Sequence, residues 1–161
     1  VTDWNGRASM KFRVDVAFSC KLGFDIGFKK VSDEDKQYCQ NAIKEYNRLK
    51  PVIYSPDLYR LVSPYDGEHC VLQRVSEDKS HALVFVYDIH PRYNENLLPT
   101  KLQGLEANAK YRVKEVSLMP GRQSWLTCND KVYTGDYLMN VGIKVLSSND
   151  MVSHIIEITK E

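Results

Sequence analysis

The spacing of apolar residues changes near residue 51, and this change constrains the fold more than any other feature of the sequence. Before residue 51, apolar side chains recur every three or four positions, which is typical of helices. After it they fall into short runs separated by turn signals, which is typical of strands. No helical pattern separates these runs, so we expect two helices followed by an antiparallel β-domain, divided as residues 1–50 and 51–161.

Two helices are predicted in residues 1–50. The first covers about residues 8–22, and Gly23 follows as a helix stop. The second begins after Ser32, whose side chain can accept from free amides, and the acidic run 33–35 faces the positive end of the helix dipole. Pro51 is expected to end it. The stripe predicted for the first helix consists of Met10, Val14, Ala17 and Phe18.

Short strands account for most of the remaining chain. The run 82–87 is apolar on both faces and is expected to be a central, buried strand, whereas 111–116 alternates between apolar and charged residues. The fold class that follows is mainly β, an antiparallel β-sandwich with Greek-key-like connections. The predicted strands are 58–62, 70–75, 82–87, 101–105, 111–116, 143–146 and 152–159.

The overall composition excludes several classes of partner. The chain is 43% hydrophobic and 27% charged, with a net charge of +1, which gives no reason to expect nucleic acid. No apolar run approaches the roughly 20 residues that cross a bilayer, so we expect no membrane partner. The chain opens at Val1 with a polar stretch and no strand before the first helix, so we expect it to be a piece of a longer protein. The compartment, cytoplasm or periplasm, stays open.

The residues that could bind metal or act in catalysis form no recognisable constellation. The four cysteines are too scattered for a zinc site or a disulfide scaffold and are expected to be buried free thiols, and no cofactor is expected. There is no nucleophile elbow and no glycine-rich phosphate loop. Asp66 and Glu68 are expected to be solvated in a turn, and the histidines to be structural or solvated. The cysteines are Cys20, Cys39, Cys70 and Cys128, and the histidines are His69, His81, His90 and His154.

Two tryptophans lie in polar loops, Trp4 in "TDWNGR" and Trp125 in "RQSWLTC". A tryptophan in such a loop can stack on the apolar face of a sugar ring, or it can fill a local core. The sequence leaves both interpretations open.

Four segments, in order, resemble glycoside hydrolase family 36, the family of α-galactosidases. The clearest is "VYTGDYLMNVGIKV" (132–145), which is similar to the terminal motif of the family. In it, Gly135 and Gly142 are expected to supply backbone freedom at turns, with residues 137–139 as an apolar plug. The other three are "GRASMKFRVDVAFSCKLGFDIGFKKVSDED" (6–35), "LYRLVSPYDGEHCVLQRVSEDKSHALVFVY" (58–87) and "LQGLEANAKYRV" (102–113).

The resemblance implies an architecture and an activity. Residues 1–50 would hold the last helix of a truncated (β/α)₈ barrel and a linking helix, and residues 51–161 the C-terminal β-sandwich that braces the barrel. The parent would be a retaining hydrolase that removes terminal α-D-galactose from oligosaccharides such as raffinose or melibiose. Its catalytic aspartates would lie upstream, because no residue here matches either motif. This chain alone is therefore expected to be inactive and to contain no catalytic residue and no metal.

The resemblance also implies one segment near the substrate. Residues 2–5 would follow the last barrel strand at the mouth of the barrel, with Trp4 as a sugar-facing aromatic and Asp3 and Asn5 as weaker candidates. The expected partners are α-galactoside oligosaccharides, bound through the parent barrel, and further copies, either as a homo-oligomer of the parent or by self-association of the fragment through the apolar stripe of helix 8–22. The alternative is a stand-alone carbohydrate-binding or interaction module, in which Trp125 would contact sugar.

Overall fold

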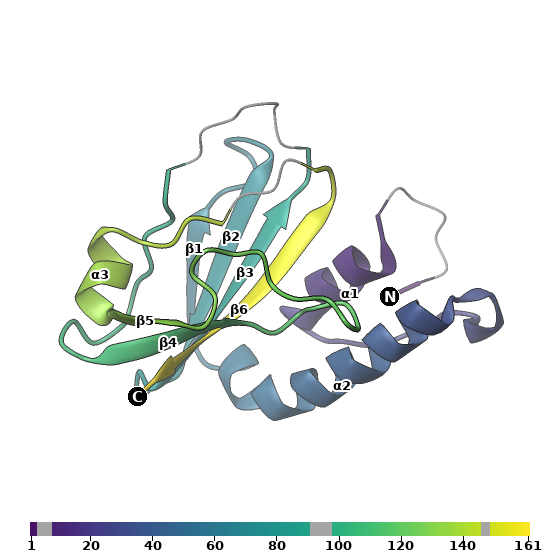
Figure 1. Cartoon of the computed structure of the whole chain (residues 1–161), viewed down its shortest axis with the longest axis horizontal. Helices are drawn as coiled ribbons and strands as arrows, with labels where there is room; N and C mark the ends of the chain where they lie inside the picture. The colour runs from purple at the N-terminus through teal and green to yellow at the C-terminus, as the bar shows by residue number, and fades with distance from the viewer. Residues whose placement is uncertain (3–7, 91–97, 146–148) are drawn as a thin grey trace.

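The computed structural model describes residues 1–2, 8–90, 98–145 and 149–161, and six strands within them form one antiparallel sheet (Figure 1). The strand order is β1-β2-β3-β6-β4-β5, so the last strand of the chain lies inside the sheet, between β3 and β4. The two parts of the sheet, β1-β2-β3 and β4-β5, are therefore joined through the C-terminal strand β6. The strands are β1 (Asp57–Val62), β2 (His69–Val75), β3 (His81–Asp88), β4 (Lys110–Glu115), β5 (Lys131–Thr134) and β6 (Val152–Lys160).

Two helices, α1 (Met10–Phe18) and α2 (Asp33–Ile53), lie together on one side of the sheet, with the short 3₁₀ helix η1 (Phe28–Lys30) between them in sequence (Figure 1). The predicted N-cap is confirmed, because the Ser32 hydroxyl accepts from the amide of Asp35. The predicted end at Pro51 is wrong. Val52 and Ile53 are buried in the core, and this packing carries α2 to Ile53 despite the proline. No helix in the described ranges is long and apolar enough to cross a membrane.

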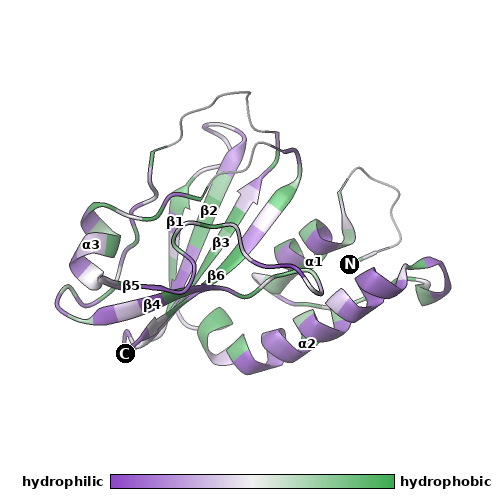
Figure 2. Ribbon diagram, in the orientation of Figure 1, coloured by the Kyte–Doolittle hydropathy of each residue, from purple (hydrophilic) through white to green (hydrophobic). Residues whose placement is uncertain are grey.

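The helices and the sheet share one core. Central strand β3 sends Leu83, Phe85 and Tyr87 toward the helices, where they pack with side chains of α2. Its other residues, Val84 among them, face the opposite layer, so the prediction of a strand buried on both faces is confirmed. Figure 2 shows the same concentration of apolar residues on β2, β3 and β6. Removing α1 and α2 would therefore expose a full face of the sheet.

The expected β-sandwich is met only in part. The domain is mainly β and antiparallel, but its strands form one sheet in the part of the chain that the structure describes. The second layer is built from loops and the short helix α3 (Gly135–Asn140) instead of a second sheet. The side chains that fill this layer against the sheet are Leu102, Leu105, Leu126, Cys128, Leu138, Ile143 and Val145.

Two predicted strands belong to that loop layer. Residues 101–105 form no strand, because Gly104 takes a positive φ of +72° that interrupts extended backbone. Ile143 makes only an isolated bridge to Thr100, and residue 146 lies outside the described residues. Strand β5 was not predicted, because its residues are mostly exposed and show no alternation.

The apolar stripe of α1 packs inside the chain. Val14 is fully buried, and Met10 and Phe18 are nearly so, against α2 and the sheet. The stripe is thus covered by packing within the chain, and it is not left free for the self-association expected from the sequence. The helix itself is shorter than the predicted range 8–22 and ends at Phe18.

Candidate functional site

The predicted substrate-adjacent residues Asp3, Trp4 and Asn5 lie outside the described residues. Their neighbours at the start of the chain are held beside α1. The Val1 ammonium donates to the carbonyl of Gly23 at 2.7 Å, and the Arg13 guanidinium donates to the carbonyl of Thr2 at 2.6 Å. The role of residues 3–5 at a barrel mouth stays a prediction.

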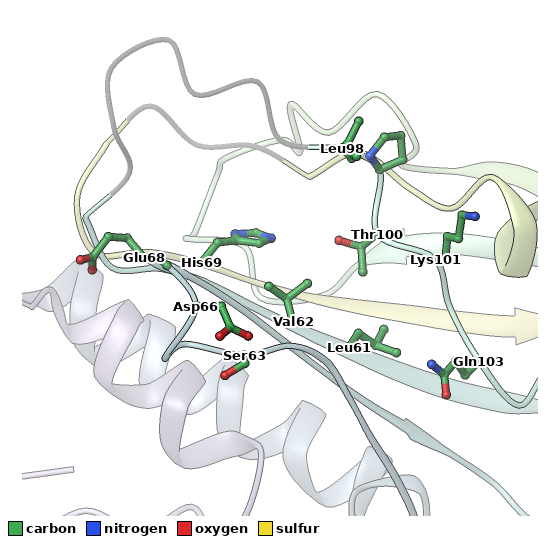
Figure 3. A pocket seen from close by; sticks show the side chains of 12 residues that line it. Leu61, Val62, Ser63, Asp66, Glu68, His69, Leu98, Thr100, Lys101 and Gln103 are labelled. Atoms are coloured by element: carbon green, nitrogen blue, oxygen red, sulfur yellow. The ribbon is translucent and has the colours of Figure 1, made fainter.

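A cleft of about 570 Å³ opens between β1 and a distant segment of the chain (Figure 3). One wall comes from the end of β1 and the turn that leads to β2, and the other from the segment 98–103, which is remote in sequence. The cleft combines apolar and polar side chains. They belong to Leu61, Val62, Ser63, Asp66, Glu68, His69, Leu98, Pro99, Thr100, Lys101 and Gln103.

A buried carboxylate fixes the histidine of this cleft. His69 Nδ1 donates to Asp88 across the β2–β3 pair, and Asp88 is fully buried. The other carboxylate oxygen of Asp88, Oδ2, has no partner among the described residues. Because Nδ1 is engaged, Nε2 is the ring nitrogen left for the cleft. His69 is therefore structural, as expected, through its Nδ1, while its ring also lines the cleft.

A second polar cluster joins α1 to the sheet. Asp15 is fully buried and accepts from Lys11 Nζ at 2.5 Å, from Ser153 Oγ at 2.7 Å and from the hydroxyl of Tyr38. Burial, followed by the Asp15 charge, raises the pKa of Tyr38 above its ordinary value. Lys11 also donates to the carbonyl of Ser153 at 2.6 Å. These contacts connect α1, α2 and β6 and give the cluster a structural role.

Trp125 packs against a third group of buried polar side chains, the pair His154 and Glu115. The Trp125 ring is 59% exposed and meets His154 edge to face, with centroids 5.1 Å apart. His154 Nδ1 donates to Glu115 Oε1 at 2.6 Å, and Ser124 donates to the other oxygen. Burial alone would raise the pKa of Glu115, but these hydrogen bonds outweigh it and lower the pKa. Trp125 thus partly fills a local site and leaves half of its surface free.

Glu157 on β6 is the centre of a fourth cluster. Arg48 of α2 donates to both of its oxygens, at 2.7 and 2.8 Å, and His81 of β3 lies 2.7 Å from Oε1. Glu45 of α2 shares the same guanidinium. Burial alone would raise the pKa of Glu157, but the hydrogen bonds from Arg48 and His81 lower it to about 2.

This shift predicts a pH dependence of stability. A carboxyl whose pKa is lower in the folded state stabilises the fold fully above its ordinary pKa of 4.5, and this contribution is lost as the pH falls toward about 2. Glu157→Gln should therefore lower the urea midpoint clearly at pH 7 and much less at pH 3. The exposed control Glu77→Gln should change little at either pH. An equal loss for Glu157→Gln at both pH values would contradict the assignment.

The described residues contain no group of three or more His, Cys, Asp or Glu side chains that could hold a metal ion. All four cysteines are free; three are buried as expected, whereas Cys20 is exposed. Burial is the first cause that raises the pKa of the thiols of Cys39, Cys70 and Cys128, which disfavours the reactive thiolate. The buried acids Asp15, Asp88, Glu115 and Glu157 are each bonded inside the fold.

Comparison with known proteins places the chain in a class. Residues 69–158 match the model of the glycosyl hydrolase family 36 C-terminal domain. The match spans β2 to β6 and more than half of the chain. The chain therefore belongs to glycoside hydrolase family 36, and the family inferred from its sequence motifs is confirmed.

The relatives are much longer than this chain. It is 29% identical to α-galactosidase AgaA of Geobacillus stearothermophilus over 147 residues, which are 91% of this chain and 18% of that protein. It is 32% identical over 127 residues to the bifunctional α-galactosidase/sucrose kinase AgaSK of Mediterraneibacter gnavus, covering 79% of this chain and 12% of that protein. The crystal structure of AgaB from G. stearothermophilus superposes on the whole chain with a TM-score of 0.83 and 26% identity, over 21% of AgaB. The chain thus spans about a fifth of the length of such relatives, or less.

Proposed function

We propose that this chain is the C-terminal part of a retaining α-galactosidase, in which it braces the catalytic barrel. The observation that carries the proposal is the family match, together with relatives named α-galactosidases whose sequences and structures cover nearly the whole chain. The substrates would be terminal α-D-galactosides of oligosaccharides. Related variants of AgaA have been solved with raffinose and with stachyose, which supports this class.

In this proposal, the chemistry belongs to another part of the protein. A retaining glycosidase places two carboxyl groups about 5 Å apart across the scissile bond. The buried carboxylates of this chain are bonded to cations, hydroxyls or histidines of the fold, as Asp15 is to Lys11 and Glu157 to Arg48, so they are committed to structure. The catalytic pair would then come from the barrel, at the ends of its strands.

The helices would carry the bracing role. We infer that α1 is the last helix of the barrel, that α2 is the link, and that residues 51–161 form the C-terminal domain. The shared core of α1, α2 and the sheet supports this, since it ties the three together as one body. A homo-oligomer of the parent remains part of the proposal. The buried stripe of α1 gives no support to self-association through that helix.

The activity is tested with a chromogenic α-galactoside. The full-length natural protein should hydrolyse it with retention of configuration, and the 161-residue chain alone should not. Circular dichroism of the short chain is the control, since inactivity is informative only if the chain is folded. Inactivity of the full-length protein, or turnover by the folded chain alone, would refute the proposal.

A further inference from the structure

We propose that the cleft between the β1–β2 turn and the segment 98–103 is a binding site for a neutral hexose unit (Figure 3). Its volume of about 570 Å³ lies within the range of about 300–1,000 Å³ typical of small-molecule sites. The inference concerns binding only, and it does not require the hydrolase activity proposed above.

The apolar part of the cleft fits the carbon-bound face of a sugar. Leu61 and Val62 line it from the end of β1, both only partly buried. Leu98 lines it from the opposite wall and is 84% exposed. Contact with the apolar face of a sugar ring would remove this side chain from water.

The polar part of the cleft fits the hydroxyls of a sugar. Asp66 and Glu68 can accept from them, Thr100 can donate or accept, and Lys101 can donate. No hydrogen bond between described residues engages the side chains of Asp66, Glu68 or Thr100, so these groups are available to a ligand. Two carboxylates against one ammonium disfavour an anionic ligand, which leaves a neutral polyhydroxy compound as the better fit.

His69 supplies a fixed contact in this cleft. Its Nδ1 donates to the buried Asp88, which holds the ring in place and leaves Nε2 as the nitrogen that can exchange a hydrogen bond with a sugar hydroxyl. In Figure 3, the imidazole extends from β2 into the space between Glu68 and Thr100. A side chain held in this way loses little freedom when a ligand binds.

The test is a ligand-observed NMR titration of the full-length natural protein with D-galactose, which is not a substrate for hydrolysis. Asp66→Asn and Thr100→Val should each weaken binding at the cleft, and Asp66→Asn by about tenfold, since it removes a charge-assisted hydrogen bond. The exposed acid Glu77, in the β2–β3 turn, gives the matched control Glu77→Gln, which should bind as the wild type does. D-Galacturonate should bind at least about tenfold more weakly than galactose, because the two carboxylates repel it.

A second readout separates this proposal from the first. Hydrolysis of the chromogenic α-galactoside and the melting temperature are measured on the same samples, and both should be unchanged in Asp66→Asn and Thr100→Val. Galactose titrations that are identical in the wild type and both cleft variants would overturn the binding site, whatever the hydrolysis result. Loss of hydrolysis in every sample would overturn the proposed activity and leave the binding result intact.

Discussion

Gly142→Ala should lower the free energy of unfolding of the 161-residue chain by about 3 kcal/mol or more. Gly142 has a φ of +88°, which strains any residue with a Cβ. An added Cβ would also lie 2.2 Å from the carbonyl oxygen of Thr100. That carbonyl cannot easily move, since it accepts from the amide of Ile143 at 3.0 Å in the bridge that holds the loop layer. The strain and the clash therefore add.

Gly121→Ala is the matched control. Gly121 has a similar φ of +69°, but an added Cβ would meet nothing within 4 Å. This variant should cost only the strain of the left-handed conformation, about 1 kcal/mol. The effect of the alanine on the unfolded chain is the same in both variants, so the difference between their urea denaturation curves isolates the clash. Equal losses of unfolding free energy in the two variants would show that the backbone around Gly142 shifts to relieve the clash, and would contradict the prediction.

Gly135 was expected to be needed for its backbone freedom, and the structure gives a different reason. Its φ is not in the positive range, but an added Cβ would lie 2.0 Å from the carbonyl oxygen of Glu106. Gly135 is thus required for close packing at the start of α3, whereas Gly142 is required for both conformation and packing. Sequence spacing could place the two glycines at the ends of the motif, but it could not distinguish these causes. The apolar plug expected between them is met best by Leu138, which is fully buried, while Tyr137 is 40% exposed.

Strands were predictable where burial imposes a pattern. The run 82–87 and the alternation in 111–116 correspond to β3 and β4, because successive residues of a strand face opposite sides of the sheet. Both sides of β3 are buried, whereas β4 has one buried side and one exposed side. The loop layer was not predictable in the same way. Leu102 and Leu105 are buried like strand residues, yet the backbone between them is not extended. Apolar residues in the sequence indicate which side chains are buried, but they do not indicate the backbone conformation that buries them.

The cleft was beyond sequence reasoning for a related reason. Asp66 and Glu68 are exposed turn residues, as expected, and solvation is the ordinary state of such acids. They share a cleft with Leu98 and Thr100 because the segment 98–103, some thirty residues later in the sequence, forms its other wall. Only the resemblance to family 36 carried functional information, and it pointed to residues 3–5 rather than to this cleft.

Asp15→Asn should lower the free energy of unfolding by about 3 kcal/mol, because it breaks a buried charge cluster from the centre. One oxygen of Asp15 accepts from Lys11 and Ser153, and the other accepts from Tyr38. Asparagine keeps one acceptor oxygen for Lys11 and Ser153, and its amide donor then faces the Tyr38 hydroxyl, which must turn its own proton away in order to accept. The Lys11 ammonium, at 20% side-chain exposure, would lose its counter-charge but stay largely away from water.

Asp33→Asn is the matched control, since it removes the same charge from a carboxylate that is 99% exposed and paired with Lys36. Its cost should be below about 1 kcal/mol. If urea denaturation gave similar losses for the two variants, Asp15 would not be the connection between the helices and the sheet. A large loss for Asp15→Asn alone would mean that α1 is held to β6 by a charge that water cannot replace. The bracing proposed for the parent enzyme needs a connection of that kind, because a helix held only by its apolar stripe could pack in more than one register.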